Sequence, residues 1–193
     1  MSGDHSDATI ARRVRRLETL LEEKGLLSGG ALDESIDAFL LGASPANGAH
    51  VVARAWTDPA YRARLLADGT AAVRELGYLR EAAPRLRVVE NTESVHNVIV
   101  CTLCSCYPLS LLGPSPSWYK SEAYRSRVVR EPRAVLAEFG LHLPAGTEIT
   151  VWDSSAETRY LVLPRRPEGT GQLTEQALAA LVTRYALIGT AAV

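Results

Sequence analysis

The chain has 193 residues, of which 47% are hydrophobic, and its 21 basic and 22 acidic residues leave a net charge of −1. A chain of this length and composition can bury one sizeable core, and its balanced charge argues against nucleic acid as a partner. It contains no run of the ~20 apolar residues that a membrane span needs, and acids and arginines interrupt its start where a signal peptide would be apolar. The sequence therefore predicts a cytoplasmic protein with neither a nucleic acid nor a membrane partner.

The N-terminal part of the chain is predicted to be helical throughout. Apolar residues recur at helical spacing over 11–30, where Ser28, Gly29 and Gly30 supply a stop. Further helices are predicted over 32–41, before Trp56, from the cap-like pair Asp58 and Pro59 toward Asp68, and over 70–77. We expect residues 1–46 to form a helical arm and residues 47–193 to form a catalytic metal-binding domain.

The pattern changes after Pro84 to strands and helices in alternation. Short runs rich in β-branched residues predict strands over 86–90, 97–101, 147–152 and 159–163. Helical patterns cover 121–130, 132–139 and 174–184, and the Pro- and Gly-rich pieces 113–117 and 165–171 are predicted loops. The predicted fold class is α+β: the helical arm is followed by a mixed α/β domain with layered sheets and flanking helices.

The three cysteines of the chain, Cys101, Cys104 and Cys106, all lie in the stretch VCTLCSC after the second predicted strand. Thiols this close together cannot link distant parts of a fold, so a secreted disulfide framework is disfavoured. Three soft sulfur donors can instead converge on one transition metal, which predicts a metal-binding loop after the strand. Small buried thiols or a strained local disulfide, and a structural zinc site, remain as alternatives.

A fourth side-chain ligand for such a metal is not evident. The histidines His5, His50, His96 and His142 are isolated in the sequence, and only His96 lies near the cysteines. An iron–sulfur cluster would also lack its usual fourth thiolate. The coordination sphere therefore needs an unusual ligand.

Several segments in the same order carry a resemblance to a known family. The motif VCTLCSC, preceded by VVENTESVHNVI and followed by WYKSEAYRSRVVREPRAVL and AETRYLVLPRRPEGT, resembles the α subunit of nitrile hydratases, cobalt type, and the related metal-bearing subunit of thiocyanate hydrolase. The upstream stretch ARAWTDPAYRARLLADGTAAVRELGY is similar to the same family. The resemblance implies an enzyme that hydrates a nitrile to the corresponding amide. A thiocyanate hydrolase subunit and a non-catalytic metal-binding module are the alternatives.

The resemblance also implies the ligands of the metal. One trivalent ion per subunit would be held by Cys101, Cys104 and Cys106 together with the main-chain amides of Ser105 and Cys106. Cys104 would be oxidised to a sulfinate and Cys106 to a sulfenate, both steps on the cysteine oxidation ladder. Thr102 resembles the cobalt subgroup, so cobalt is expected rather than iron. Cys104, Ser105 and Cys106 are the implied catalytic residues, and either the Cys106 oxygen or a bound water is the nucleophile.

The residues after the last cysteine depart from the family pattern. Tyr107, Leu109 and Ser110 are the predicted pocket residues, and Leu109 stands where many relatives carry a large aromatic side chain. A leucine there widens the cavity and predicts a bulky or heteroaromatic nitrile as substrate. Trp118 and Tyr119, close by in sequence, are expected to pack in the core or in an interface.

Partners are implied in the same way. A β-type subunit, as one chain or split in two, would supply arginines to the oxidised sulfurs, and an activator or chaperone would deliver cobalt. Arg125, Arg127 and Arg130 are accordingly expected at a helix surface or interface. The apolar face of the arm helix needs a cover, which its own domain or a partner chain would supply, and the C-terminal stretch YALIGTAAV is also expected to be covered. A hetero-oligomer is favoured.

Overall fold

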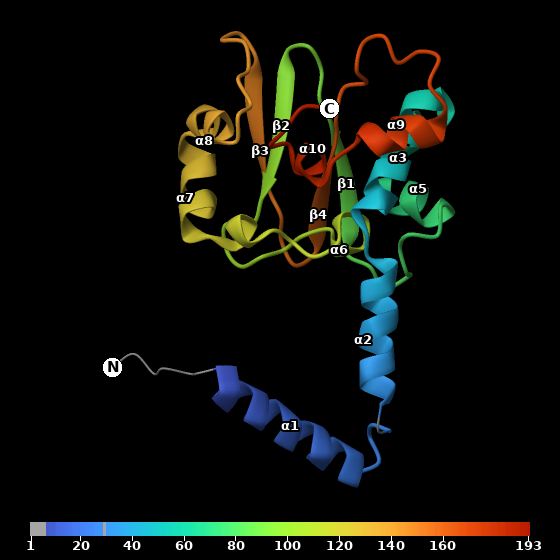
Figure 1. Cartoon of the computed structure of the whole chain (residues 1–193), viewed down its shortest axis with the longest axis vertical. Helices are drawn as coiled ribbons and strands as arrows, with labels where there is room; N and C mark the ends of the chain where they lie inside the picture. The colour runs from blue at the N-terminus through green and yellow to red at the C-terminus, as the bar shows by residue number, and fades with distance from the viewer. Residues whose placement is uncertain (1–6, 29) are drawn as a thin grey trace. The chain divides into compact units, whose positions relative to one another are not determined.

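The computed structural model describes residues 7–28 and 30–193, and the chain divides into two compact units after Leu41 (Figure 1). The first unit contains helix α1 (Asp7–Glu23) and most of helix α2 (Ala31–Gly42). The helix predicted over 11–30 begins earlier and ends earlier. Gly25 takes a positive φ of 65°, and Leu26 N–H donates to Leu21 O at 2.9 Å, which closes α1 before the expected stop at Ser28.

Three helices begin the second unit: α3 (Pro45–Thr57), α4 (Pro59–Ala67) and α5 (Gly69–Glu75). Their N-caps are Ser44, Asp58 and Asp68, and the side chain of each accepts a hydrogen bond from a main-chain N–H in the first turn of its helix. The predicted Asp58–Pro59 helix start is confirmed. Because Asp58 and Asp68 also follow the last residue of the preceding helix, α3, α4 and α5 are joined by single residues.

The four predicted strands are confirmed to within two residues. Strands β1 (Arg85–Glu90) and β4 (Thr158–Leu163) pair in parallel, and so do β2 (Val95–Val100) and β3 (Glu148–Asp153). Strand β2 ends at Val100, so Cys101 opens the following loop instead of closing the strand. Two small sheets of two strands each result, in agreement with the predicted mixed α/β class.

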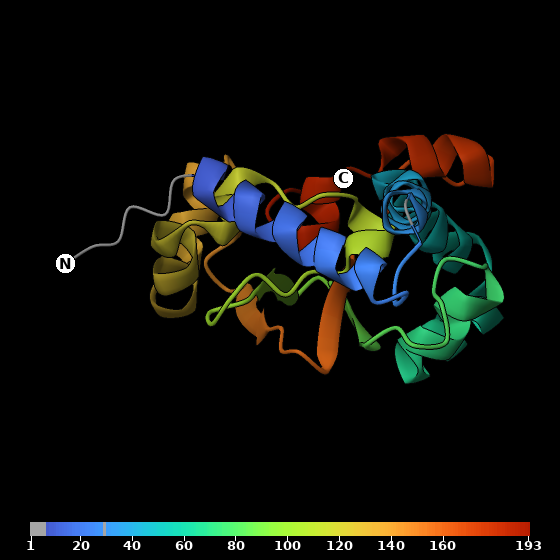
Figure 2. The ribbon, with the colours of Figure 1, turned by 90° about the horizontal axis from the view of Figure 1, so that it is seen from below.

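Helices close the remaining sides. The short α6 (Leu109–Leu112) and the 3-10 helix η1 (Ser117–Lys120) were not predicted, whereas α7 (Glu122–Arg130) and α8 (Pro132–Glu138) were. The helix predicted over 174–184 is two helices, α9 (Glu175–Leu181) and α10 (Arg184–Ile188), because Val182 is extended and Thr183 caps the second one. Figures 1 and 2 show α7 and α8 on one side of the strands and α3, α4 and α5 on the other.

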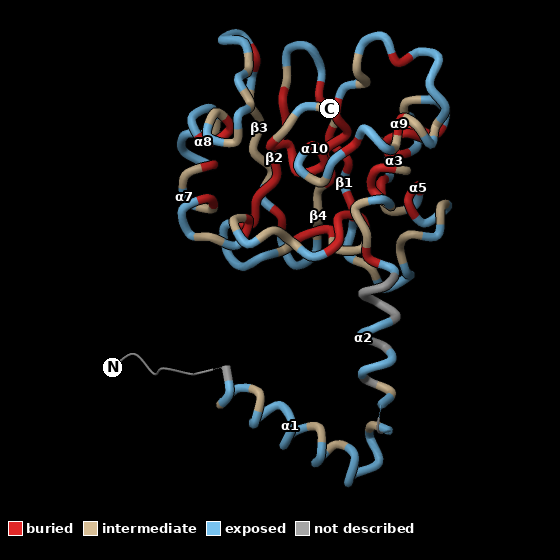
Figure 3. The backbone as a smooth tube through the Cα atoms, viewed as in Figure 1, coloured by how far each residue is buried: buried red, intermediate tan, exposed pale blue. Residues whose placement is uncertain are grey.

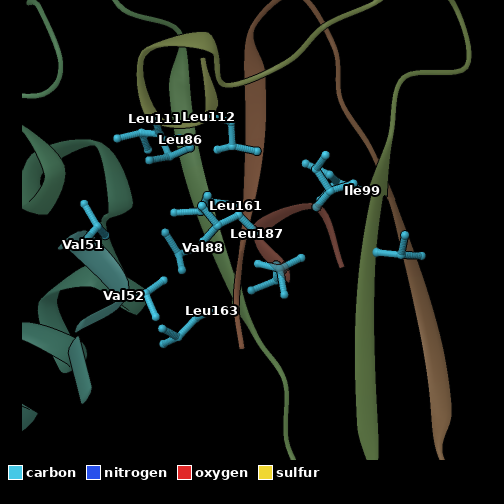
Figure 4. Packing of buried hydrophobic residues seen from close by; sticks show 14 of the residues in the cluster. Val51, Val52, Leu86, Val88, Ile99, Leu111, Leu112, Leu161, Leu163 and Leu187 are labelled. Atoms are coloured by element: carbon cyan, nitrogen blue, oxygen red, sulfur yellow. The ribbon is translucent and has the colours of Figure 1, made fainter. Parts of the chain in front are cut away.

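The core of the second unit lies between these helices and the two sheets (Figure 3). Figure 4 shows its centre, where side chains of α3, α6 and α10 meet those of the strands: Val51, Val52, Leu86, Val88, Ile99, Leu111, Leu112, Leu161, Leu163 and Leu187. The apolar C-terminal stretch is covered by its own unit, because Ala186, Leu187 and Ile188 are fully buried. In the described part of the chain, no helix is long and apolar enough to cross a bilayer.

A buried histidine makes folding sensitive to pH. His96 Nε2 lies 2.7 Å from Gly189 O and His96 Nδ1 lies 3.2 Å from Asn91 Nδ2, so the neutral ring donates at one nitrogen and accepts at the other. Burial lowers the pKa of His96, although its bond to Gly189 opposes the shift. The unfolded chain therefore binds a proton more readily than the folded chain does.

We expect the free energy of unfolding to fall as the pH drops through about 6.5, the ordinary pKa of histidine, and to stop falling below the lowered pKa of the folded state. Urea unfolding at a series of pH values measures this. His96→Gln should have a shallower dependence on pH than the wild type, whereas the same change at the exposed His142 should leave the dependence as it is. Equal slopes in all three proteins would contradict the prediction.

Candidate metal centre

The stretch VCTLCSC leaves β2 at the carboxyl end of the strand and is fixed there to the neighbouring strand. Val98, Ile99 and Val100 are fully buried, so the strand is anchored in the core up to the first cysteine. Asp153, the last residue of β3, accepts hydrogen bonds from Thr102 N at 2.9 Å and from Thr102 Oγ1 at 2.5 Å. Parallel pairing brings these two strand ends together, so the metal loop, residues 101–106, starts from a rigid platform.

The structure brings the three predicted sulfurs together. Cys101 Sγ lies 3.5 Å from Cys104 Sγ, which lies 3.3 Å from Cys106 Sγ, and all three lie within 4.8 Å of one another. Cys101 is buried, Cys106 is half-buried and Cys104 is exposed, and all three are free thiols. These separations exceed the ~2 Å of a disulfide bond, so the alternative of a local disulfide is not realised.

The thiols of Cys104 and Cys106 have very different pKa values. Hydrogen bonds from Cys106, from the main chain of Ser105, and from Cys101 lower the pKa of Cys104 to about 7. Burial, followed by the bond to Cys104, raises the pKa of Cys106 to about 12. A single bond thus shifts the two pKa values in opposite directions, because the proton that stays on Cys106 stabilises the thiolate of Cys104. A cation at the cluster would take the place of these protons.

The donor set fits a transition metal that prefers sulfur. Among the described residues, no histidine or carboxylate joins the cysteine group as a further ligand. His96, the candidate nearest in sequence, is occupied by Gly189 and Asn91, and His50 contacts Tyr78 and Glu175 elsewhere in the fold. A tetrahedral zinc site would need such a fourth ligand, so the geometry disfavours that alternative.

Three side chains that the sequence did not reveal hold the main chain of the metal loop and of the strand end that leads into it. Tyr124 Oη donates to Ile99 O at 2.7 Å, and Tyr119 Oη donates to Cys106 O at 3.0 Å. Arg125 Nη1 donates to Cys104 O at 3.0 Å and lies 3.4 Å from Leu103 O. These contacts join residues at least 13 positions apart by hydrogen bonds to main-chain atoms, and such bonds leave no periodic signal in a sequence.

The arginines of α7 therefore differ in role. Arg127 pairs with Glu131 and Glu138, and Arg130 bonds to Ser126 O, so both lie at the helix surface as predicted. The same prediction for Arg125 is incomplete, because its guanidinium reaches the metal loop. Tyr119 is fully buried and packs as predicted, but it also bonds to Cys106.

The predicted pocket residues follow the metal loop directly. Tyr107 is buried, its ring meets that of Tyr119 at 4.9 Å between centroids, and its hydroxyl has no hydrogen-bond partner. Leu109 begins α6, and Ser110 O accepts a bond from Asn47 Nδ2 at 2.9 Å, which ties Ser110 to the start of α3. A surface hollow of about 800 Å³ lies elsewhere, between α8 and the first residues of β3.

Trp118 packs between aromatic rings as predicted. Its centroid lies 4.6 Å from that of Phe139 and 4.8 Å from that of Tyr124, which fixes η1 against α7 and α8. The rigid aromatic cluster in turn places Tyr119, Tyr124 and Arg125 beside the metal loop.

Comparison with known proteins extends over nearly the whole chain. The family described as "Nitrile hydratase, alpha chain" matches residues 8–191. The low-molecular weight cobalt-containing nitrile hydratase subunit alpha of Rhodococcus rhodochrous is 52% identical over 184 residues, which cover 95% of this chain and 89% of the relative. The thiocyanate hydrolase subunit gamma of Thiobacillus thioparus is 46% identical over 183 residues, covering 88% and 74%. A double mutant of the Fe-type nitrile hydratase from Comamonas testosteroni Ni1 superposes with a TM-score of 0.87 at 45% identity, covering 97% and 91%.

Proposed function

The chain belongs to the nitrile hydratase alpha-chain family, and from this premise we propose that it is the metal-binding catalytic subunit of a cobalt-type nitrile hydratase. Such an enzyme adds water to a nitrile and releases the corresponding amide. The observation that carries the proposal is the convergence of three free sulfurs within 4.8 Å, with no fourth side-chain ligand among the described residues.

The proposed ligands are the sulfurs of Cys101, Cys104 and Cys106 and the main-chain amides of Ser105 and Cys106. The main-chain hydrogen bonds of Ser105 and Cys106 that contribute to lowering the pKa of Cys104 support this assignment. When bound, a trivalent ion supplies Lewis acidity that activates a nitrile or a water molecule. The same ion would stabilise the proposed Cys104 sulfinate and Cys106 sulfenate.

The chain's own groups then have separate tasks. The buried Cys101 fixes the site to β2. The half-buried Cys106 is proposed to carry the sulfenate oxygen, which would take the proton of an attacking water or attack the nitrile carbon itself. The exposed Ser105 carries a hydroxyl that can both donate and accept, which suits it to orient water or substrate. Tyr119 holds the Cys106 carbonyl and so keeps that sulfur in place.

We propose cobalt and not iron because sequence relatives are described as cobalt-containing. The Rhodococcus rhodochrous relative and a 49% identical relative from Pseudonocardia thermophila are both described as cobalt-containing. The iron-type structural neighbour has the same fold, so the fold itself does not select the metal. We therefore propose one cobalt ion per chain. Thr102, beside Cys101, is the residue that resembles the cobalt subgroup.

A β-type partner subunit is proposed because the oxidised sulfurs need hydrogen-bond donors. Arg125 is already bound to carbonyl oxygens of the metal loop, so it does not serve the sulfurs, and Leu103 at the loop is 89% exposed, which suits an interface. We also propose an activator that delivers cobalt. Cytoplasmic localisation is proposed because reducing conditions keep three adjacent thiols unpaired.

The decisive experiment separates the two related activities. The chain is produced with its partner subunit in cobalt-containing medium, and the product is measured after incubation with nitriles or with thiocyanate. Amide from nitriles is the expected product. Carbonyl sulfide from thiocyanate, without amide, would support the alternative activity of the Thiobacillus thioparus relative. Failure of wild-type material to bind cobalt under these conditions would contradict the proposal itself.

Substrate choice gives a second test. With Leu109 at the start of α6, beside the metal loop, we expect kcat/KM for an aromatic nitrile such as 3-cyanopyridine to exceed that for acetonitrile by about tenfold or more. Leu109→Trp should reduce or reverse this ratio, because the larger side chain would narrow the proposed substrate pocket. Leu181→Trp, which adds the same side chain at an exposed position of α9, is the matched control. A wild-type preference for acetonitrile would refute the widened pocket.

A further inference from the structure

The carbonyl clamp, formed by Tyr119, Tyr124 and Arg125, binds main-chain carbonyls of the metal loop and of the end of β2. The tyrosines bind the carbonyls at the two ends, Ile99 O before the first cysteine and Cys106 O at the last. Arg125 binds between them, at Cys104 O and Leu103 O. Arg125 is therefore the member of the clamp that binds main-chain carbonyls between the first and the last cysteine.

The Arg125 contact fixes the orientation of one particular amide. The Cys104 carbonyl and the Ser105 N–H belong to the same peptide unit, which is planar and trans, so the two groups point in opposite directions. When Arg125 draws the carbonyl toward α7 at 3.0 Å, the Ser105 N–H must turn away from α7. It lies beside the sulfurs, because Ser105 stands between Cys104 and Cys106, whose Sγ atoms are 3.3 Å apart.

Arg125 is itself held in a fixed position. Helix α7 begins at the Ser121 cap, which accepts a bond from Tyr124 N at 3.2 Å, and Tyr124 and Val128 bury its inner face. The aromatic contacts of Trp118 add to this packing. A guanidinium placed from a packed helix can hold a carbonyl in one direction more firmly than water can.

We propose that Arg125 is a positioning residue that turns the main-chain nitrogen of Ser105 toward the metal, so that the metal loop offers nitrogen as well as sulfur before the metal arrives. This inference rests on the proposed function, because it takes the Ser105 amide as a ligand. It adds a residue of this chain whose contribution is orientation and not direct contact with the metal.

The test compares the ligands of cobalt in the wild type, Arg125→Met, Arg125→Lys and the control Arg130→Met. Arg130 lies on the same helix, and its Nε bonds to Ser126 O within α7. Each chain is produced with its partner subunit and cobalt. Absorption at the cobalt X-ray edge then counts sulfur and nitrogen neighbours, and elemental analysis gives cobalt per chain.

Wild type and Arg130→Met are expected to show both sulfur and nitrogen neighbours. In Arg125→Met the sulfur neighbours should persist while the fraction of cobalt with nitrogen neighbours falls by about tenfold, and Arg125→Lys should recover part of it, because an ammonium can still bind the Cys104 carbonyl. A merely structural role would lower total cobalt without changing the ratio of nitrogen to sulfur in the bound fraction.

Three outcomes would overturn the inference: an unchanged ratio of nitrogen to sulfur in Arg125→Met, an equal change in Arg130→Met, or an Arg125→Lys protein that melts like the wild type yet regains no nitrogen neighbours. The comparison of Arg125→Lys with the wild type keeps the inference testable if Arg125→Met folds poorly. If wild-type protein itself binds cobalt without nitrogen neighbours, or binds none, the proposed function fails before the variants are compared.

Discussion

Cys101→Ala is expected to abolish cobalt binding and nitrile hydration together. Cys101 is the fully buried member of the cluster, and its sulfur accepts the Cys104 N–H at 3.3 Å, so its loss removes one metal ligand and the anchor of the next cysteine. Changes to residues that only support a ligand cost 10–100-fold in metal affinity or activity. Loss of the ligand itself should therefore lower amide production by more than about 100-fold.

The measurement pairs cobalt per chain after dialysis with amide formation by chromatography. Leu103→Ala is the matched control, because Leu103 lies in the same loop, is 89% exposed and carries no donor. It should keep its cobalt, and its activity should stay within a few-fold of the wild type. Cys101→Ala protein that retains a full complement of cobalt would show that the cluster does not hold the metal in the proposed way.

Local signals in the sequence account for most of the second unit. Short polar caps such as Asp58, and runs of β-branched residues such as those of β2, act within a few neighbouring residues, so sequence patterns can locate them. The metal loop could be located for the same reason, because its three donors lie within six positions. Its proposed chemistry required the family resemblance, since the proposed main-chain ligands leave no residue signature.

Features set by distant contacts were not predictable. The break between α9 and α10 at Val182 places Leu187 and Ile188 in the core, and nothing in the local helical pattern demands it. The role of Arg125 depends on a carbonyl 21 residues away in the chain. In both cases tertiary packing decides between conformations that the local sequence permits equally.

Gly189→Ala is expected to lower the free energy of unfolding substantially, although it adds only one methyl group. Gly189 ends α10 with a φ of 91°, and an added Cβ would lie 2.0 Å from Asn97 O and 2.8 Å from Val98 Cα in β2. A left-handed conformation costs a non-glycine residue about 1–2 kcal/mol, and overpacking costs about 1–3 kcal/mol more. We expect the free energy of unfolding to fall by about 3 kcal/mol and the melting temperature by roughly 6–12 °C, measured by urea and thermal unfolding.

Gly169→Ala separates the two causes. Gly169 also has a positive φ, 76°, but no atom lies within 4 Å of its added Cβ, so this variant should lose only about 1 kcal/mol. Equal losses in the two variants would show that the contact with β2 is not tight. Because β2 ends one residue before Cys101, the backbone shift forced by Gly189→Ala should also reach the metal loop, and cobalt should be released at a lower temperature in this variant than in Gly169→Ala.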